Sequence, residues 1–271
     1  MTEAYAPRRT ARPFTLPLRG LALQLHCWDG RAADAAPLVA LHGWMDVGAS
    51  FQFLADALPA HRTLIALDWR GFGGSRGTPG TDSYWFPDYL GDLDAVLRQL
   101  SPDHPVDLLG HSMGANVAMV YAGVRPARIR RLMALEGFGM PPTSPAQAPG
   151  RYTRWLDELA QPAQLRPYAS VDEVAQRLCR NNPRLRADRA LWLASHWAEQ
   201  RDDGHWHLRA DPAHKRVNPI LYRAEEADAC WRAITAPTLW LEGAQTDVLK
   251  HHGPDAHARF HTRLAQVASL Q

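Results

Sequence analysis

The chain has 271 residues, of which 46% are hydrophobic and 21% are charged, and its formal net charge is +2 at pH 7. This length and composition are typical of a globular protein with one large α/β domain or two small ones. The near balance of charge argues against a nucleic-acid partner, and no run approaches the roughly 20 apolar residues that span a bilayer. We therefore expect neither nucleic-acid binding nor a membrane span.

The cysteines and the N-terminal residues indicate the cellular compartment of the protein. Cys27, Cys179 and Cys230 are widely spaced, odd in number and in no metal-ligand pattern. Residues 1–14 contain basic side chains but no apolar stretch behind them, unlike a secretory signal peptide. Because such isolated cysteines are typical of reduced proteins, the sequence predicts a cytoplasmic location.

Short apolar runs alternate with amphipathic segments in the first half of the chain. The predicted helix over 50–59 has Ser50 as its N-cap and Pro59 as its end. Such an alternation indicates a parallel sheet with helices on both faces. The predicted strands cover 21–28, 37–44, 62–75, 105–112 and 129–139, and the further predicted helices cover 85–100 and 113–126.

The pattern changes at the proline-rich segment 140–150. From there to residue 226 the chain reads as helical with prolines between the helices, and a strand pattern resumes at 236–248. We interpret 140–226 as a helical cap inserted between two parts of a core domain, 1–139 and 227–271. Such a cap would cover the carboxyl edge of the sheet, where open α/β folds bind ligands. Most of its tryptophans are interpreted as cap core, with one or two facing the pocket: Trp155, Trp192, Trp197 and Trp206.

A G-x-S-x-G motif stands between a predicted strand and a predicted helix. It reads Gly110-His111-Ser112-Met113-Gly114. A sharp strand-to-helix turn lifts the serine hydroxyl clear of the sheet edge, and glycines are needed because side chains would collide where helix and strand come close. The motif predicts Ser112 as a nucleophile. The alternative, a serine in an incidental glycine turn, does not explain the flanking strand and helix.

A nucleophilic serine needs N–H donors for the negative charge that develops on the substrate carbonyl oxygen. The Met113 N–H, at the start of the predicted helix, is one expected donor. The loop after strand 37–44 supplies the other, with the Trp44 N–H as the candidate and Gly43 allowing the backbone to bend. His42 in the same loop is interpreted as a structural histidine rather than a base.

Four segments, 42–51, 67–75, 110–115 and 237–248, together resemble the α/β-hydrolase superfamily in the right order along nearly the whole chain. Within it, the loop HGWMD-x-x-x-SF and segment 181–193 are similar to the serine hydrolase-like family of esterases. The resemblance implies an α/β fold with a mostly parallel sheet flanked by helices and an inserted helical cap. Haloalkane dehalogenases and epoxide hydrolases of this superfamily have an aspartate where this chain has Ser112, so the resemblance favours acyl chemistry.

In this superfamily the catalytic residues follow in the order Ser, then Asp or Glu, then His. Asp247 matches the position of the acid, because segment 236–248 reads as a strand, then Gly243, then a short turn that carries the aspartate. Its alternative role is to cap the helix that follows. Glu136, at the end of strand 129–139, is the runner-up acid, and Glu242 is assigned to its strand and not favoured.

The histidine is expected after one more helix, 253–265, and one more strand, 266–270, which places it just after Gln271. The chain up to Gln271 is therefore expected to lack the triad histidine and to be inactive or weakly reactive. No metal site is predicted, because His205 and His207 are too isolated to form one. The other candidates are interpreted as solvated or structural histidines: His196, His205, His207, His214, His251, His252, His257 and His261.

The sequence thus predicts a serine hydrolase, specifically a carboxylesterase that acts on small or medium acyl esters through a Ser-His-Asp mechanism. Its expected partner is a small-molecule ester, and no cofactor is needed. An acyltransferase, a lactonase or a C–C bond hydrolase on the same scaffold stays open. So does a hydrolase-fold binding protein with little turnover.

Overall fold

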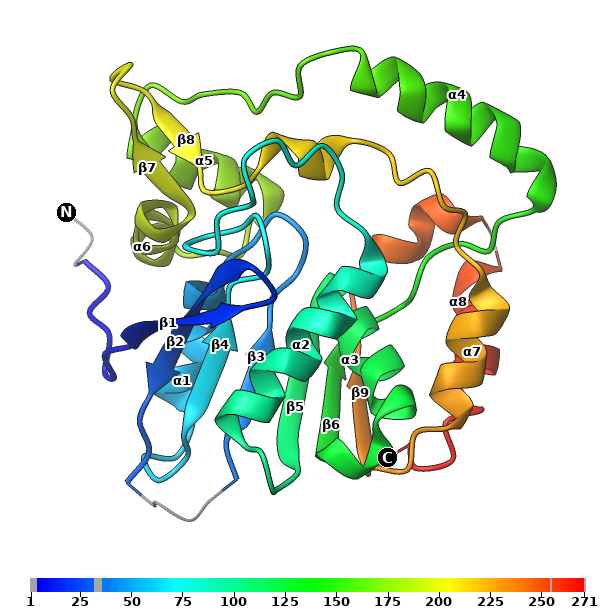
Figure 1. Cartoon of the computed structure of the whole chain (residues 1–271). Coiled ribbons are helices and arrows are strands. Elements are labelled where there is room, and N and C mark those ends of the chain that lie inside the picture. Colours follow the sequence, from blue (N-terminus) through cyan, green and yellow to red (C-terminus); the bar gives the residue numbers. More distant parts are fainter. Residues whose placement is uncertain (1–3, 32–35, 254, 271) are drawn as a thin grey trace.

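The computed structural model describes residues 4–31, 36–253 and 255–270. A seven-stranded sheet crosses this part of the chain in the order β1-β2-β4-β3-β5-β6-β9 (Figure 1). The pairs from β4 to β9 are parallel, whereas β2 pairs antiparallel with both β1 and β4. The strands are β1 (Arg12–Leu18), β2 (Leu21–Trp28), β3 (Leu38–Leu41), β4 (Leu64–Leu67), β5 (Val106–His111), β6 (Ile129–Leu135) and β9 (Thr238–Leu241).

Helices lie on both faces of the sheet, as the first half of the sequence predicts. Successive side chains of a strand point to opposite faces of the sheet. In β3, Val39 and Leu41 pack into one buried cluster, and Leu38 and Ala40 pack into another. Buried residues of α2, α3, α7 and α8 belong to the first cluster, and those of α1 to the second. The mostly parallel sheet flanked by helices is therefore confirmed. The helices are α1 (Gln52–Ala57), α2 (Phe86–Leu100), α3 (Met113–Val124), α7 (Ala224–Arg232) and α8 (Ala256–Leu264).

Strand β1 was not predicted from the sequence. It contains Pro13 and Pro17, which lack the N–H that a strand needs for pairing on both sides. The strand lies at the edge of the sheet and pairs only with β2, so the missing donors cost little there. Edge position thus explains why a proline-containing segment forms a strand.

The prediction that Ser50 caps the helix over 50–59 is wrong. Residues Gly48–Phe51 form a 3-10 turn (η1), and α1 follows it with no side-chain cap hydrogen bond. The Ser50 hydroxyl instead donates to the carboxylate of Asp46. The Ser50 hydroxyl therefore bonds to the Asp46 side chain and not to the backbone at the start of the helix.

The elements of segment 140–226, which the sequence predicts as a cap, lie over the carboxyl ends of the parallel strands (Figure 1). Its own core contains Tyr168 and Leu193, and three of its tryptophans pack against that core, as predicted: Trp192, Trp197 and Trp206. A small hairpin was not predicted, because its strands have only three residues each. The cap elements are α4 (Ala148–Leu159), α5 (Val171–Asn181), α6 (Ala187–Trp197), β7 (Ala198–Gln200) and β8 (Trp206–Leu208).

The division into core and cap at residues 139/140 and 226/227 stays a prediction. Its second boundary falls within α7, and this helix packs closely on α3, where a Cβ at Gly123 would lie 1.8 Å from the carbonyl oxygen of Cys230. Cys27, Cys179 and Cys230 are free thiols. No helix in the described ranges is long and apolar enough to cross a bilayer.

The strand predicted over 266–270 is wrong for the described residues. Segment 266–269 forms turns, and Leu270 makes an isolated parallel bridge with Thr238 of β9. Ser269 accepts a backbone hydrogen bond from Thr238 at 2.9 Å. The segment thus contacts β9 through Ser269 and Leu270 and forms no strand in the described residues.

Candidate active site

Ser112 lies at the turn between β5 and α3, in a backbone conformation that side chains rarely adopt. Its φ is 52° and its ψ is −116°. Its N–H donates to the carbonyl of Leu135 in β6 at 2.8 Å, and its carbonyl accepts from Asn116 in α3 at 3.0 Å. Strain of this kind persists only where surrounding structure holds it, and it is the geometry of a nucleophile elbow.

The two glycines of the motif are required by close approach. A Cβ at Gly110 would lie 2.4 Å from the carbonyl oxygen of Gly114, and one at Gly114 would lie 2.2 Å from that of Leu41. Both distances are far below van der Waals contact with backbone that cannot move aside. The steric reason predicted for these glycines is therefore confirmed.

The loop after β3 lies against Ser112. A Cβ at Gly43 would be 3.3 Å from the Cβ of Ser112, so the glycine allows the loop to approach the serine. In the described part of the chain, no acceptor takes the backbone N–H of Trp44 or of Met113. Among the described residues, the two N–H groups expected to bind an oxyanion are therefore not taken by another acceptor, as oxyanion binding requires.

His42 has a structural role, as the sequence suggests. Its side chain is fully buried; Nδ1 donates to the carbonyl of Gly43 at 2.7 Å, and Nε2 accepts from the Trp69 N–H at 3.0 Å. Burial lowers the pKa of His42 to about 4, so the ring is neutral at physiological pH. Both nitrogens are occupied in ordering the loop, which leaves none for base catalysis.

A hydrogen-bonded chain links this loop to the cap. Trp197 of α6 donates its indole N–H to the Ser50 hydroxyl at 2.8 Å, and that hydroxyl donates to Asp46. The Asp46 carboxylate also accepts from the Val47 N–H at 2.7 Å. Burial raises the pKa of Asp46 to about 6. Sequence reasoning missed this contact, because the partners lie 147 residues apart.

Glu136 and Asp247, the two acid candidates, differ in what they contact. Glu136 follows β6 with a φ of 56°, and its carboxylate accepts from the Thr246 hydroxyl at 2.6 Å and from the Gly243 N–H. Asp247 is exposed, and in the described part of the chain its carboxylate takes no hydrogen bond. Glu136 is thus engaged in holding the turn that precedes Asp247, whereas Asp247 is available.

None of the described histidine side chains hydrogen-bonds to the Ser112 hydroxyl. His214 is stacked between Phe72 and Tyr84, with ring centroids 3.9 and 3.7 Å away, and burial lowers its pKa to about 3. His196 stacks on a cap tryptophan, and His207 pairs with Asp203 at 2.8 Å. The side chains of His251 and His252, and the histidine expected after Gln271, lie outside the described residues.

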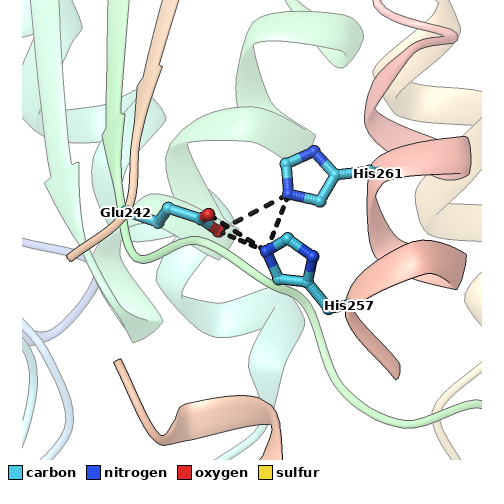
Figure 2. Close-up of side chains that lie close together, drawn as sticks. All are labelled: Glu242, His257 and His261. Atoms are coloured by element: carbon cyan, nitrogen blue, oxygen red, sulfur yellow. Dashed lines mark hydrogen bonds and ion pairs between the residues drawn. The ribbon is translucent and has the colours of Figure 1, made fainter. Parts of the chain in front are cut away.

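Three further side chains converge in a group that was not predicted as a site. Glu242 follows β9, and His257 and His261 stand one turn apart on α8 (Figure 2). The i,i+4 spacing of the histidines was visible in the sequence. The approach of Glu242 was not, since it depends on how α8 packs beside β9.

Comparison with known proteins identifies the scaffold. The model of the alpha/beta hydrolase fold family matches residues 36–267. The chain belongs to this family. It is 32% identical to a serine hydrolase-like protein of Danio rerio over 136 residues, which are 50% of this chain and 41% of that protein. The match therefore spans less than half the length of that relative.

Two further α/β hydrolases are similar over most of the chain. A 3-hydroxybutyrate-oligomer hydrolase of Cupriavidus necator is 29% identical over 236 residues, covering 83% of this chain and 77% of that one. The thioesterase domain from the curacin biosynthetic pathway superposes with a TM-score of 0.81 at 25% identity, covering 95% of this chain and 90% of the domain. The chain is thus an α/β hydrolase related to serine hydrolase-like proteins.

Proposed function

We propose that this α/β hydrolase is a carboxylesterase that acts on small or medium acyl esters through an acyl-enzyme on Ser112. The strained turn that presents the Ser112 hydroxyl beside the loop of Gly43 carries the proposal. Ser112 Oγ attacks the acyl carbon, and the N–H groups of Trp44 and Met113 stabilise the oxyanion. The ester C–O bond then breaks, the alcohol leaves, and water releases the acid from the serine.

A histidine is the general base in this proposal, and Asp247 orients its ring. The support for Asp247 is its exposed carboxylate on a turn that Glu136 holds in place. Such an acid keeps the imidazole in the correct tautomer and stabilises the imidazolium that forms during attack.

Uncovered apolar side chains support a substrate with an apolar acyl part. The Trp44 side chain, next to Gly43, is 51% exposed. No residue of α4 in the cap is buried, and Tyr152 and Leu156, one turn apart on it, are 47% and 57% exposed. The similarity to a hydrolase of 3-hydroxybutyrate oligomers and to a thioesterase domain agrees with acyl substrates.

A reduced, cytoplasmic setting with a small-molecule ester as partner completes the proposal. The three free thiols agree with that setting.

Hydrolysis of p-nitrophenyl esters by the natural full-length protein tests the proposal. We expect Ser112→Ala to lower kcat by about 10³-fold or more, since removal of a catalytic serine leaves only binding and oxyanion effects. A fluorophosphonate probe should label the wild-type protein and not the variant. Equal ester hydrolysis by both proteins would overturn the assignment of Ser112.

A further inference from the structure

Three metal-ligating side chains meet at the end of β9 (Figure 2). Nε2 of His257 lies 3.0 and 3.2 Å from the two carboxylate oxygens of Glu242. Nε2 of His261 lies 3.1 Å from Nε2 of His257 and 3.5 Å from Oε2 of Glu242. All the possible ligand atoms fall within 4.8 Å of one another. Two imidazole nitrogens and a carboxylate thus point at one small volume.

We propose that Glu242, His257 and His261 form a binding site for a divalent transition-metal ion, with Zn²⁺ as its best-fitting occupant. Zinc binds nitrogen and oxygen ligands at about 2.0–2.1 Å, and tetrahedral angles then place the ligand atoms about 3.3–3.4 Å apart. The observed separations of 3.1, 3.2 and 3.5 Å lie close to that edge length. The three groups therefore match one face of a zinc coordination tetrahedron.

The donor set selects the class of ion. Imidazole suits zinc, copper, nickel and iron, whereas magnesium and calcium prefer ligand sets made of oxygen. Exposure leaves the remaining coordination position to water: the side chains of His257, His261 and Glu242 are 58%, 43% and 28% exposed. Two imidazoles and one glutamate with an open fourth position are a ligand set that zinc uses in proteins.

The ligands stand on elements that packing holds in place. Phe260 and Leu264 of α8 are each 3% exposed within the main core cluster, so the helix that carries both histidines is anchored. The ring of Trp240 meets that of His261 edge-on, with centroids 5.7 Å apart, and limits its rotation. Arg263, on the same helix, pairs with Asp228 at 2.7 Å, so its positive charge is compensated.

An ion at this site would tie α8 to the end of β9. Glu242 and His257 are 15 residues apart, and the segment between them carries Asp247. A metal ion that binds only the folded state would raise the free energy of unfolding with the logarithm of its free concentration. Metal binding itself is independent of Ser112; an effect of the metal on turnover would rest on the proposed function.

Calorimetric titration of the tag-free full-length protein with ZnCl₂ tests the site. We expect about one equivalent of Zn²⁺ per chain, and binding at least about tenfold weaker in His257→Ala, His261→Ala and Glu242→Gln, because each loses a direct ligand. At the same concentration, Zn²⁺ should also raise the Tm of the wild-type protein more than that of His257→Ala. With Co²⁺ in place of Zn²⁺, intense visible absorption bands would report a tetrahedral environment.

His207→Ala is the matched control, because His207 is also a histidine paired with a carboxylate, at 2.8 Å from Asp203. It should bind Zn²⁺ as the wild type does. Ser112→Ala should bind it equally well, whether or not the proposed esterase activity is found. Absence of Zn²⁺ binding by the wild type, unchanged binding by the three cluster variants, or loss of binding in His207→Ala would overturn the proposal.

Discussion

The carboxylate of Glu136 accepts a hydrogen bond from the hydroxyl of Thr246 at 2.6 Å and thereby joins the end of β6 to the loop that carries Asp247. A second bond, from the Gly243 N–H, fixes the beginning of the same loop. Glu136 adopts a φ of 56° to reach these partners, a conformation that costs of order 1 kcal/mol for a side chain of its kind. One acid candidate thus positions the other.

Substitution of each acid separates these roles. Asp247→Asn should lower kcat by about 10³–10⁴-fold, since an amide favours the wrong histidine tautomer. Glu136→Gln keeps one acceptor for Thr246 and should lower kcat/KM by about tenfold through a loosened loop. Ester hydrolysis by the full-length variants measures both effects. A larger loss in Glu136→Gln than in Asp247→Asn would make Glu136 the catalytic acid.

Gly114, in the first turn of α3, allows a prediction about the free energy of unfolding. Gly114→Ala places a methyl group 2.2 Å from the carbonyl oxygen of Leu41, so helix and strand must separate, at a cost of about 2–4 kcal/mol in the free energy of unfolding. Gly150→Ala in α4 is the control, because a Cβ there meets nothing within 4 Å and alanine favours the helix by up to about 1 kcal/mol. Urea unfolding of the two variants should show shifts of opposite sign, and similar shifts would contradict the steric argument.

The buried ion pair between Asp92 of α2 and Arg70 yields another prediction. Asp92 has a fully buried side chain and accepts two hydrogen bonds from Arg70, both at 2.6 Å. Asp92→Ala leaves the Arg70 guanidinium, 15% exposed, with Asp88 at 3.1 Å as its remaining carboxylate partner and should cost about 3 kcal/mol. Asp29→Ala breaks the exposed pair with Arg12 and should change the midpoint of urea unfolding little. Equal midpoints for the two variants would show that burial of Asp92 does not decide its contribution.

The sequence predicted correctly those parts of the fold whose structure follows from a few consecutive residues. The apolar runs of β3 and β5, and the glycines around Ser112, follow from burial on both faces and from close packing, and both are visible in a few consecutive residues. β1 was missed because its prolines argue against a strand everywhere except at an edge. Which strand forms the edge is decided by the whole sheet.

Long-range partners account for most of what the sequence did not predict at the site. The Ser50 hydroxyl contacts Asp46 and Trp197, the latter across 147 residues, so a helix cap was the wrong assignment. Glu242 and His257 meet only because α8 packs beside β9. In each case the role of the side chain is set by a partner from a distant segment, and sequence spacing does not show that the two segments lie side by side.

The dependence of stability on acid pH tests two buried titratable groups, His214 and Asp46. Burial lowers the pKa of His214 to about 3, so the unfolded chain binds more protons below about pH 6.5, and the stability of the folded state falls as pH decreases through this range. Burial raises the pKa of Asp46 to about 6, so here the folded state binds more protons between about pH 6 and pH 4 and gains stability as pH falls. The two contributions oppose each other in the same window.

Urea unfolding between pH 7 and pH 4.5 should therefore separate the two variants by slope. His214→Phe keeps the stack with Phe72 and Tyr84 and removes the proton uptake, so its stability should depend less on pH than that of the wild type. Asp46→Asn removes the compensating gain, so its loss of stability on acidification should be steeper. His104→Gln, at an exposed position, is the control and should follow the wild-type curve. Identical slopes for all four proteins would mean that neither buried group titrates between pH 7 and pH 4.5 on unfolding.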